Sequence, residues 1–143
     1  MAAAEILAVL LLAASVFDLA RQRIPNRLTL SGLLLGLLWH GLTTGWPGLA
    51  QSLEGLGIAG LTLLLWAARV LGAGDVKLLG VVGVWMGPVF LLWTLLGTIF
   101  AGGLLAVLVV CLRRSRKGRL PLAPAIALGA TYAYCHLQLG TLF

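Results

Sequence analysis

Residues Leu78 to Leu112 form a run of 35 amino acids without a charged side chain. A helix of that length would extend about 52 Å, well beyond the roughly 30 Å hydrocarbon core of a bilayer. Shorter apolar runs recur along the 143-residue chain, and only 10% of its residues are charged. Soluble domains have roughly 25% charged residues. These features argue against a soluble enzyme and predict a single integral-membrane domain over residues 1–143.

The backbone of a membrane-spanning segment must satisfy its own hydrogen bonds, and the alternating pattern of a barrel strand is absent here. The sequence therefore predicts an all-α, polytopic membrane protein. We expect a bundle of six transmembrane helices at residues 3–21, 27–45, 52–71, 75–87, 88–112 and 120–140. The long apolar run is divided at Gly87-Pro88, because proline disrupts a helix interior and suits a first turn. The fourth helix is then short.

The ten basic residues predict the orientation of this bundle. They form three clusters, which follow the first, third and fifth expected helices: residues 21–27, residues 69–77 and residues 113–119. Six helices place all three clusters on one side, which the positive-inside rule makes cytoplasmic, with both termini outside. Because the clusters lie in short loops between spans, we expect them to bind anionic phospholipids and not nucleic acid.

No metal or other cofactor is expected. Cys111 and Cys135 do not form a CxxC pair, and the chain offers too few clustered cysteines and histidines for a zinc site. Gly32 and Gly36 form a GxxxG motif, which predicts close helix packing within one bundle. The motif is also compatible with a dimer face, so the sequence leaves a monomer and a homodimer open.

The chain contains only four acidic residues, and two of them fall at a similar expected depth on the cytoplasmic side. Asp18 lies near the end of the first helix and Asp75 opens the fourth, 57 residues later. Glu5 and Glu54 map to outer helix ends, where a carboxylate reaches water. Intramembrane carboxylates are costly and usually mark function. Asp18 and Asp75 are therefore the candidate catalytic pair.

Each aspartate also has a structural interpretation. Asp75 could cap its helix, and Asp18 could pair with Arg21 or Arg23. If the two are functional, facing carboxylates fit two classes of protein. They can activate water for peptide hydrolysis, as in aspartic proteases, or carry a proton or cation through a small transporter.

Gly72 and Gly74, which precede Asp75, bear on this choice. Glycine removes side-chain bulk and permits unusual backbone dihedral angles, so an extended peptide substrate can lie against the chain. This favours the peptidase, although a transporter could use the same glycine break.

Three sequence motifs give further evidence about the function. Asp18 is followed by Arg-Ile-Pro-Asn at residues 23–26, GAGDVK occupies residues 72–77, and LPLAPAIA occupies residues 120–127. Together they resemble the type IV prepilin peptidases, intramembrane aspartic proteases of the GxGD type. The similarity extends from Asp18 to about Ala130, with the motifs in the same order and topology.

The resemblance implies six core helices and a catalytic pair, Asp18 and Asp75, at the cytoplasmic face of the bacterial inner membrane. The implied reaction is two-aspartate hydrolysis that removes the short cytoplasmic leader of type IV prepilin or pseudopilin substrates. Larger members also N-methylate the new terminus and carry an insertion with paired CxxC motifs, which this sequence lacks. It resembles the minimal form associated with Flp/Tad pili, and N-methyltransferase activity is not expected.

The matched motifs also supply candidate supporting or substrate-binding residues: Gly72, Gly74, Lys77, Arg23, Pro25, Asn26, Pro121 and Pro124. Several of them have simpler interpretations. Pro25 and Asn26 can end a loop and cap the second helix, and the prolines of the third motif can start the last one. Lys77 can tune the aspartate pair or reach to lipid headgroups.

Overall fold

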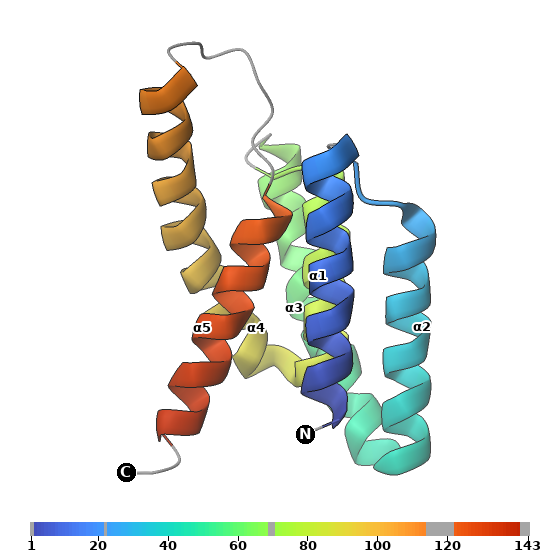
Figure 1. The fold of residues 1–143 in the computed structure, drawn as a ribbon. Coiled ribbons are helices and arrows are strands. Elements are labelled where there is room, and N and C mark those ends of the chain that lie inside the picture. Colours follow the sequence, from blue (N-terminus) through green and yellow to red (C-terminus); the bar gives the residue numbers. More distant parts are fainter. Residues whose placement is uncertain (1, 22, 69–70, 114–121, 141–143) are drawn as a thin grey trace.

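The computed structural model describes residues 2–21, 23–68, 71–113 and 122–140, and their regular structure is helical (Figure 1). The helices are α1 (Ala2–Arg21), α2 (Asn26–Thr43), α3 (Trp46–Ala67), α4 (Ala73–Arg113) and α5 (Ala123–Gly140). The prediction of an all-α fold is confirmed. The predicted bundle of six transmembrane helices is not established: five elements are described, and α4 contains both helices expected on either side of Gly87-Pro88, joined across a kink.

The expected break is nevertheless present as a bend inside α4. Gly87 has φ 80° and ψ −178°, which is not helical, and Pro88 follows it. Positive φ favours glycine, and proline cannot donate a helical hydrogen bond. Figure 1 shows the first half of α4 running away from the α1–α2 connection and the second half returning toward that end. The start of α1 and the end of α5 lie together at the opposite end of the molecule.

The outer surface of the bundle is apolar. Leu12, Leu34, Leu61 and Phe100 are all more than half exposed, as are many other large apolar side chains. Soluble monomers rarely expose extended apolar surface, whereas lipid solvates it. Among the described residues, α1, α3 and the first 36 residues of α4 are long and apolar enough to cross a membrane. The structure thus supports a membrane protein, and the three helices that meet this standard correspond to the first expected span, the third, and the fourth and fifth together.

The central helix α4 is crossed closely by α3 and α5 at pairs of glycines. A Cβ atom on Gly55 of α3 would collide with the backbone of Gly83 in α4. A Cβ on Gly97 of α4 would lie 2.8 Å from the Cα of Gly129 in α5. Small residues at such crossings let helix backbones approach each other.

The GxxxG motif of α2 also packs inside the bundle. The Gly32 carbonyl accepts a hydrogen bond of 2.9 Å from Trp85 Nε1, and Gly36 faces Val84 and Trp85. One turn further, His40 Nε2 lies 3.0 Å from the Trp85 carbonyl oxygen. The prediction that this motif serves packing within one chain is confirmed.

α3 begins at Trp46 instead of the predicted residue 52. Gly45 precedes it with φ 67°, and Pro47 lies in its first turn, where a missing N–H has no cost. Glu54 therefore lies about 12 Å beyond the helix start, at 1.5 Å per residue, with its side chain exposed. The prediction that Glu54 sits at the outer end of its helix is wrong, because the Trp-Pro-Gly segment was expected to be loop.

Candidate active site

A cavity of about 530 Å³ lies where the α1–α2 connection meets the segment that opens α4. It is lined by the end of α1, by residues 23–26 and by the GAGDVK motif: Asp18, Arg21, Arg23, Ile24, Pro25, Asn26, Gly72, Ala73, Gly74, Asp75 and Lys77. Two motifs that are 57 residues apart in the sequence therefore face one space, and each contributes an aspartate. We refer to this space as the aspartate cavity.

Asp18 is positioned by α5. Its side chain is 7% exposed, and Oδ2 accepts a hydrogen bond of 3.0 Å from the N–H of Ala123. Ala123 is the first residue of α5, so this amide has no partner within its own helix. The positive end of the helix dipole also favours a negative group there. The hydrogen bond found at Asp18 thus differs from the arginine pairing that the structural interpretation supposed.

Asp75 is held by the start of its own helix. It is 9% exposed, and its Oδ2 accepts a hydrogen bond of 3.0 Å from the N–H of Gly72. Gly72 immediately precedes α4, so Asp75 reaches back from the first turn as the acid of a capping box does. Capping of the helix does not exclude a catalytic role for Asp75. A carboxylate has two oxygens and about four acceptor positions, so it can accept other hydrogen bonds as well.

Gly74 lies in the first turn of α4 beside Ile24. A Cβ atom at this position would be 3.4 Å from Ile24 Cδ1, an ordinary contact with a flexible side chain. Positive φ among the described glycines occurs at Gly45 and Gly87, so Gly74 does not use the unusual dihedral angles that glycine permits. The glycine instead leaves the wall beside Asp75 without a side chain.

The rim of the cavity joins α2 to α4. Lys77 Nζ donates a hydrogen bond of 2.9 Å to Asn26 Oδ1. Pro25 occupies the cap position of α2, with φ −61° and ψ 131°, and no side chain caps the helix. The prediction that Asn26 caps α2 is therefore wrong, and its side chain bonds to Lys77.

The third motif contributes differently from the first two. Pro124 is the second residue of α5 and does not line the aspartate cavity, whereas Pro121 lies outside the described residues. The backbone N–H of Ala123 contacts the site instead, through its hydrogen bond to Asp18. The sequence did not predict this contact. Closely spaced prolines mark a helix start, and hence free N–H groups. They do not indicate where those groups point.

These observations define a helical membrane protein in which two buried carboxylates, each held by a backbone amide, line one cavity. Comparison with known proteins identifies the family. The model of the type IV leader peptidase family matches residues 6–107, and the chain belongs to that family.

Several curated relatives carry the name prepilin leader peptidase/N-methyltransferase. The protein from Pseudomonas aeruginosa is 32% identical over 136 residues, which cover 86% of this chain and 45% of the relative. The protein from Aeromonas salmonicida is 34% identical over 145 residues (92% and 48%), and that from Legionella pneumophila is 31% identical over 142 residues (90% and 48%). The chain spans just under half the length of these relatives. No solved structure shows a significant match.

Proposed function

We propose that this chain is an intramembrane aspartic endopeptidase that removes the short leader peptide of type IV prepilin-like or pseudopilin substrates. The observation that carries the proposal is the meeting of Asp18 and Asp75 in one cavity. Membership of the type IV leader peptidase family supports the substrate class, as do the names of the curated relatives.

In the proposed mechanism, a water molecule is activated between the two carboxylates. The ionised carboxylate takes a proton from water, and the protonated one donates to the peptide carbonyl oxygen or to the leaving amine. The amides of Gly72 and Ala123, each 3.0 Å from an Oδ2 atom, fix the orientation of the two side chains.

The neighbouring residues have supporting roles in this proposal. The peptide lies in an extended form past Gly74, where the wall has no side chain. The hydrogen bond between Lys77 and Asn26 holds the start of α4 to α2 and so positions Asp75. Arg23 and Pro25 shape the rim of the cavity, as does Gly72 beside them. Pro124, in the first turn of α5, helps to set the start of that helix and thereby the amide that binds Asp18.

We further infer that the aspartate cavity faces the cytoplasm, at the inner membrane of a bacterium, with six membrane passes and both termini outside. Arg21, Arg23, Arg27 and Lys77 all lie at or beside the cavity, and basic residues concentrate on cytoplasmic sides. The same side chains attract anionic phospholipid headgroups.

N-methylation is not part of the proposed activity. The relatives are named for two activities, leader peptidase and N-methyltransferase. The two cysteines of this chain, at positions 111 and 135, form no CxxC pair. Mass spectrometry of the mature substrate should therefore find a free N-terminal amine. A methyl group that depends on this chain alone would contradict the assignment.

The central experiment is co-expression with a prepilin in a bacterial strain that lacks its own prepilin peptidase. The wild-type chain should shorten the prepilin by its leader, which immunoblotting detects as a size shift and mass spectrometry as a new N-terminus. A variant with both Asp18→Asn and Asp75→Asn is the matched control. Failure of the wild-type protein to shorten any of several prepilins, while it accumulates in the membrane, would refute the proposal.

A further inference from the structure

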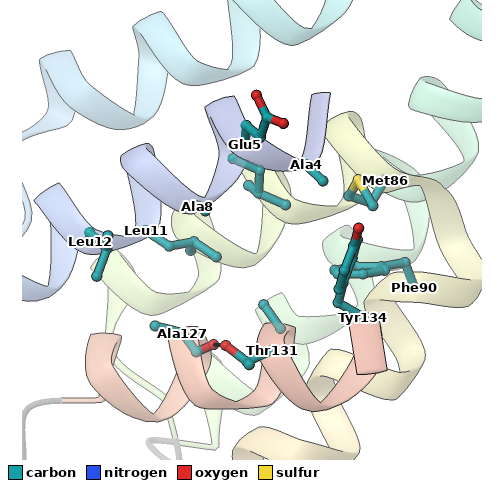
Figure 2. A pocket seen from close by; sticks show the side chains of 12 residues that line it. Ala4, Glu5, Ala8, Leu11, Leu12, Met86, Phe90, Ala127, Thr131 and Tyr134 are labelled. Atoms are coloured by element: carbon teal, nitrogen blue, oxygen red, sulfur yellow. Dashed lines mark hydrogen bonds between the residues drawn. The ribbon is translucent and has the colours of Figure 1, made fainter. Parts of the chain in front are cut away.

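A second cavity, of about 410 Å³, lies between α1 and α5 at the level of the α4 bend (Figure 2). Ala8 and Leu11 contribute one wall from α1, and Ala127 and Thr131 contribute the other from α5. Phe90, just beyond the bend, lines it from α4. We call this space the α1–α5 groove.

The groove is apolar and opens on the outer surface of the bundle. Leu12 at its edge is 63% exposed, and Ala8 is also exposed. The Thr131 hydroxyl donates a hydrogen bond of 2.9 Å to the Ala127 carbonyl of its own helix (dashed in Figure 2). Its proton is therefore used within α5. Alanines on both walls allow a neighbouring helix to approach closely. Glu5 and Tyr134 also line the groove, and most of its other side chains are apolar, so the groove suits one face of an apolar helix.

The α1–α5 groove and the aspartate cavity lie in line along α1, separated by residues 13–17, which line neither space. Ala4, Leu11 and Asp18 follow one another at intervals of seven residues, or about two turns, so they share a face of α1. On the other wall, α5 runs from Ala127 back to Ala123, whose N–H donates to Asp18. At 1.5 Å per residue, the distance along α1 from Ala4 to Asp18 is about 21 Å.

We propose that the α1–α5 groove holds the apolar helix that follows the cleavage point of a prepilin substrate. This inference rests on the proposed function. About 14 residues of the substrate helix would lie along the 21 Å between Ala4 and Asp18. The cleavage point then lies at Asp18, the leader extends over the aspartate cavity, and the apolar segment runs toward Glu5. The part of that segment seated in the groove begins about 9 Å from Asp18, at the level of Leu12, and its seating sets which peptide bond reaches the two aspartates.

Photo-crosslinking from two equally exposed leucines tests the proposal. A photoreactive amino acid replaces Leu12, which is 63% exposed at the groove, or Leu61, which is 64% exposed on α3. Both variants carry Asp75→Asn, so that a tagged full-length prepilin remains uncleaved in the membranes of co-expressing cells. Position 12 should crosslink to the prepilin, and position 61 should give little product. Equal crosslinking from both positions, or crosslinks from position 12 only to lipid or to a second copy, would overturn the proposal.

Filling the groove gives a second readout. Ala8→Phe should lower cleavage roughly tenfold at substrate concentrations below KM, a change of about 1.4 kcal/mol in binding, and should leave kcat nearly unchanged. Ala67→Phe, at an exposed alanine at the end of α3, should remain within about twofold of wild type by the same relation. Wild-type rates for Ala8→Phe would count against the groove.

The two proposals fail in distinguishable ways. Cleavage of the prepilin by the wild-type chain, without crosslinking from position 12, would refute the groove and leave the peptidase standing. Absence of cleavage by the wild-type chain would refute the peptidase, and with it the inference that depends on it.

Discussion

Asp18→Asn is the sharpest test of the site, because the structure separates its effect on folding from its effect on chemistry. The Asp18 side chain is 7% exposed and receives one hydrogen bond, from the Ala123 amide. Asparagine has nearly the same size and keeps a carbonyl oxygen that can accept this bond. It cannot ionise, so it can neither take a proton from water nor return one.

The magnitudes follow from that contact. A hydrogen bond to a charged group contributes about 1.5–3 kcal/mol, and a neutral one about 0.5–1.5 kcal/mol, so the substitution should lower the free energy of unfolding by roughly 1 kcal/mol. Asp18→Ala would leave a buried amide without its partner and should cost about 1–3 kcal/mol. In contrast, loss of a general acid or base should reduce cleavage on the order of 10²- to 10⁴-fold.

The assay is leader removal from a co-expressed prepilin, with the amount of each variant measured in the membrane fraction. Asp18→Asn and Asp75→Asn should accumulate like wild type and fail to cleave. The double variant should be little worse than either single one, because residues that act as a unit are not additive. Glu54→Gln, which changes an exposed carboxylate that lines neither the aspartate cavity nor the α1–α5 groove, should cleave nearly normally.

Substantial cleavage by either asparagine variant would refute the two-aspartate mechanism. A different pattern would favour the transporter. If the purified wild-type chain moved protons or cations across liposomes, lost that flux on the same substitutions and cleaved no prepilin, the carboxylates would serve transport.

Three further predictions concern the glycines and the topology. Gly74→Ala should be as stable as wild type or up to about 1 kcal/mol more stable, because alanine suits a helix better and its Cβ would make only ordinary contacts. It should nevertheless cleave poorly, and normal cleavage would argue against a peptide path along this wall. Gly83→Ala should destabilise the protein by about 1–3 kcal/mol, since the new Cβ would lie 2.5 Å from the Gly55 carbonyl oxygen. Thermal unfolding in detergent measures this effect. An unchanged unfolding midpoint would contradict the close approach of α3 and α4 at these glycines. Arg27→Cys and Thr44→Cys, each made in a chain whose two native cysteines are replaced, should react with membrane-impermeant thiol reagents from opposite sides of the membrane. Labelling of both from one side would exclude the proposed topology.

The helical class and the bend in α4 could be predicted from the sequence, because both have local physical causes. A long apolar run in lipid must satisfy its own backbone, which makes it helical. Pro88 cannot continue the hydrogen bonding of the preceding turn, and Gly87 accepts the positive φ of a sharp change in direction. The start of α3 was missed for a related reason: Pro47 can lie in a loop or in a first helical turn, and local chemistry does not distinguish the two.

The two aspartates could also be selected from the sequence, since a carboxylate next to long apolar runs is expensive in any arrangement. Only the tertiary structure decided how they are held. The partner of Asp18 is the amide of Ala123, 105 residues away along the chain, and every non-proline residue carries such an amide. The sequence therefore identified the groups that cost most to bury. The backbone donors that hold them, and the α1–α5 groove further along α1, follow only from the packing of the helices.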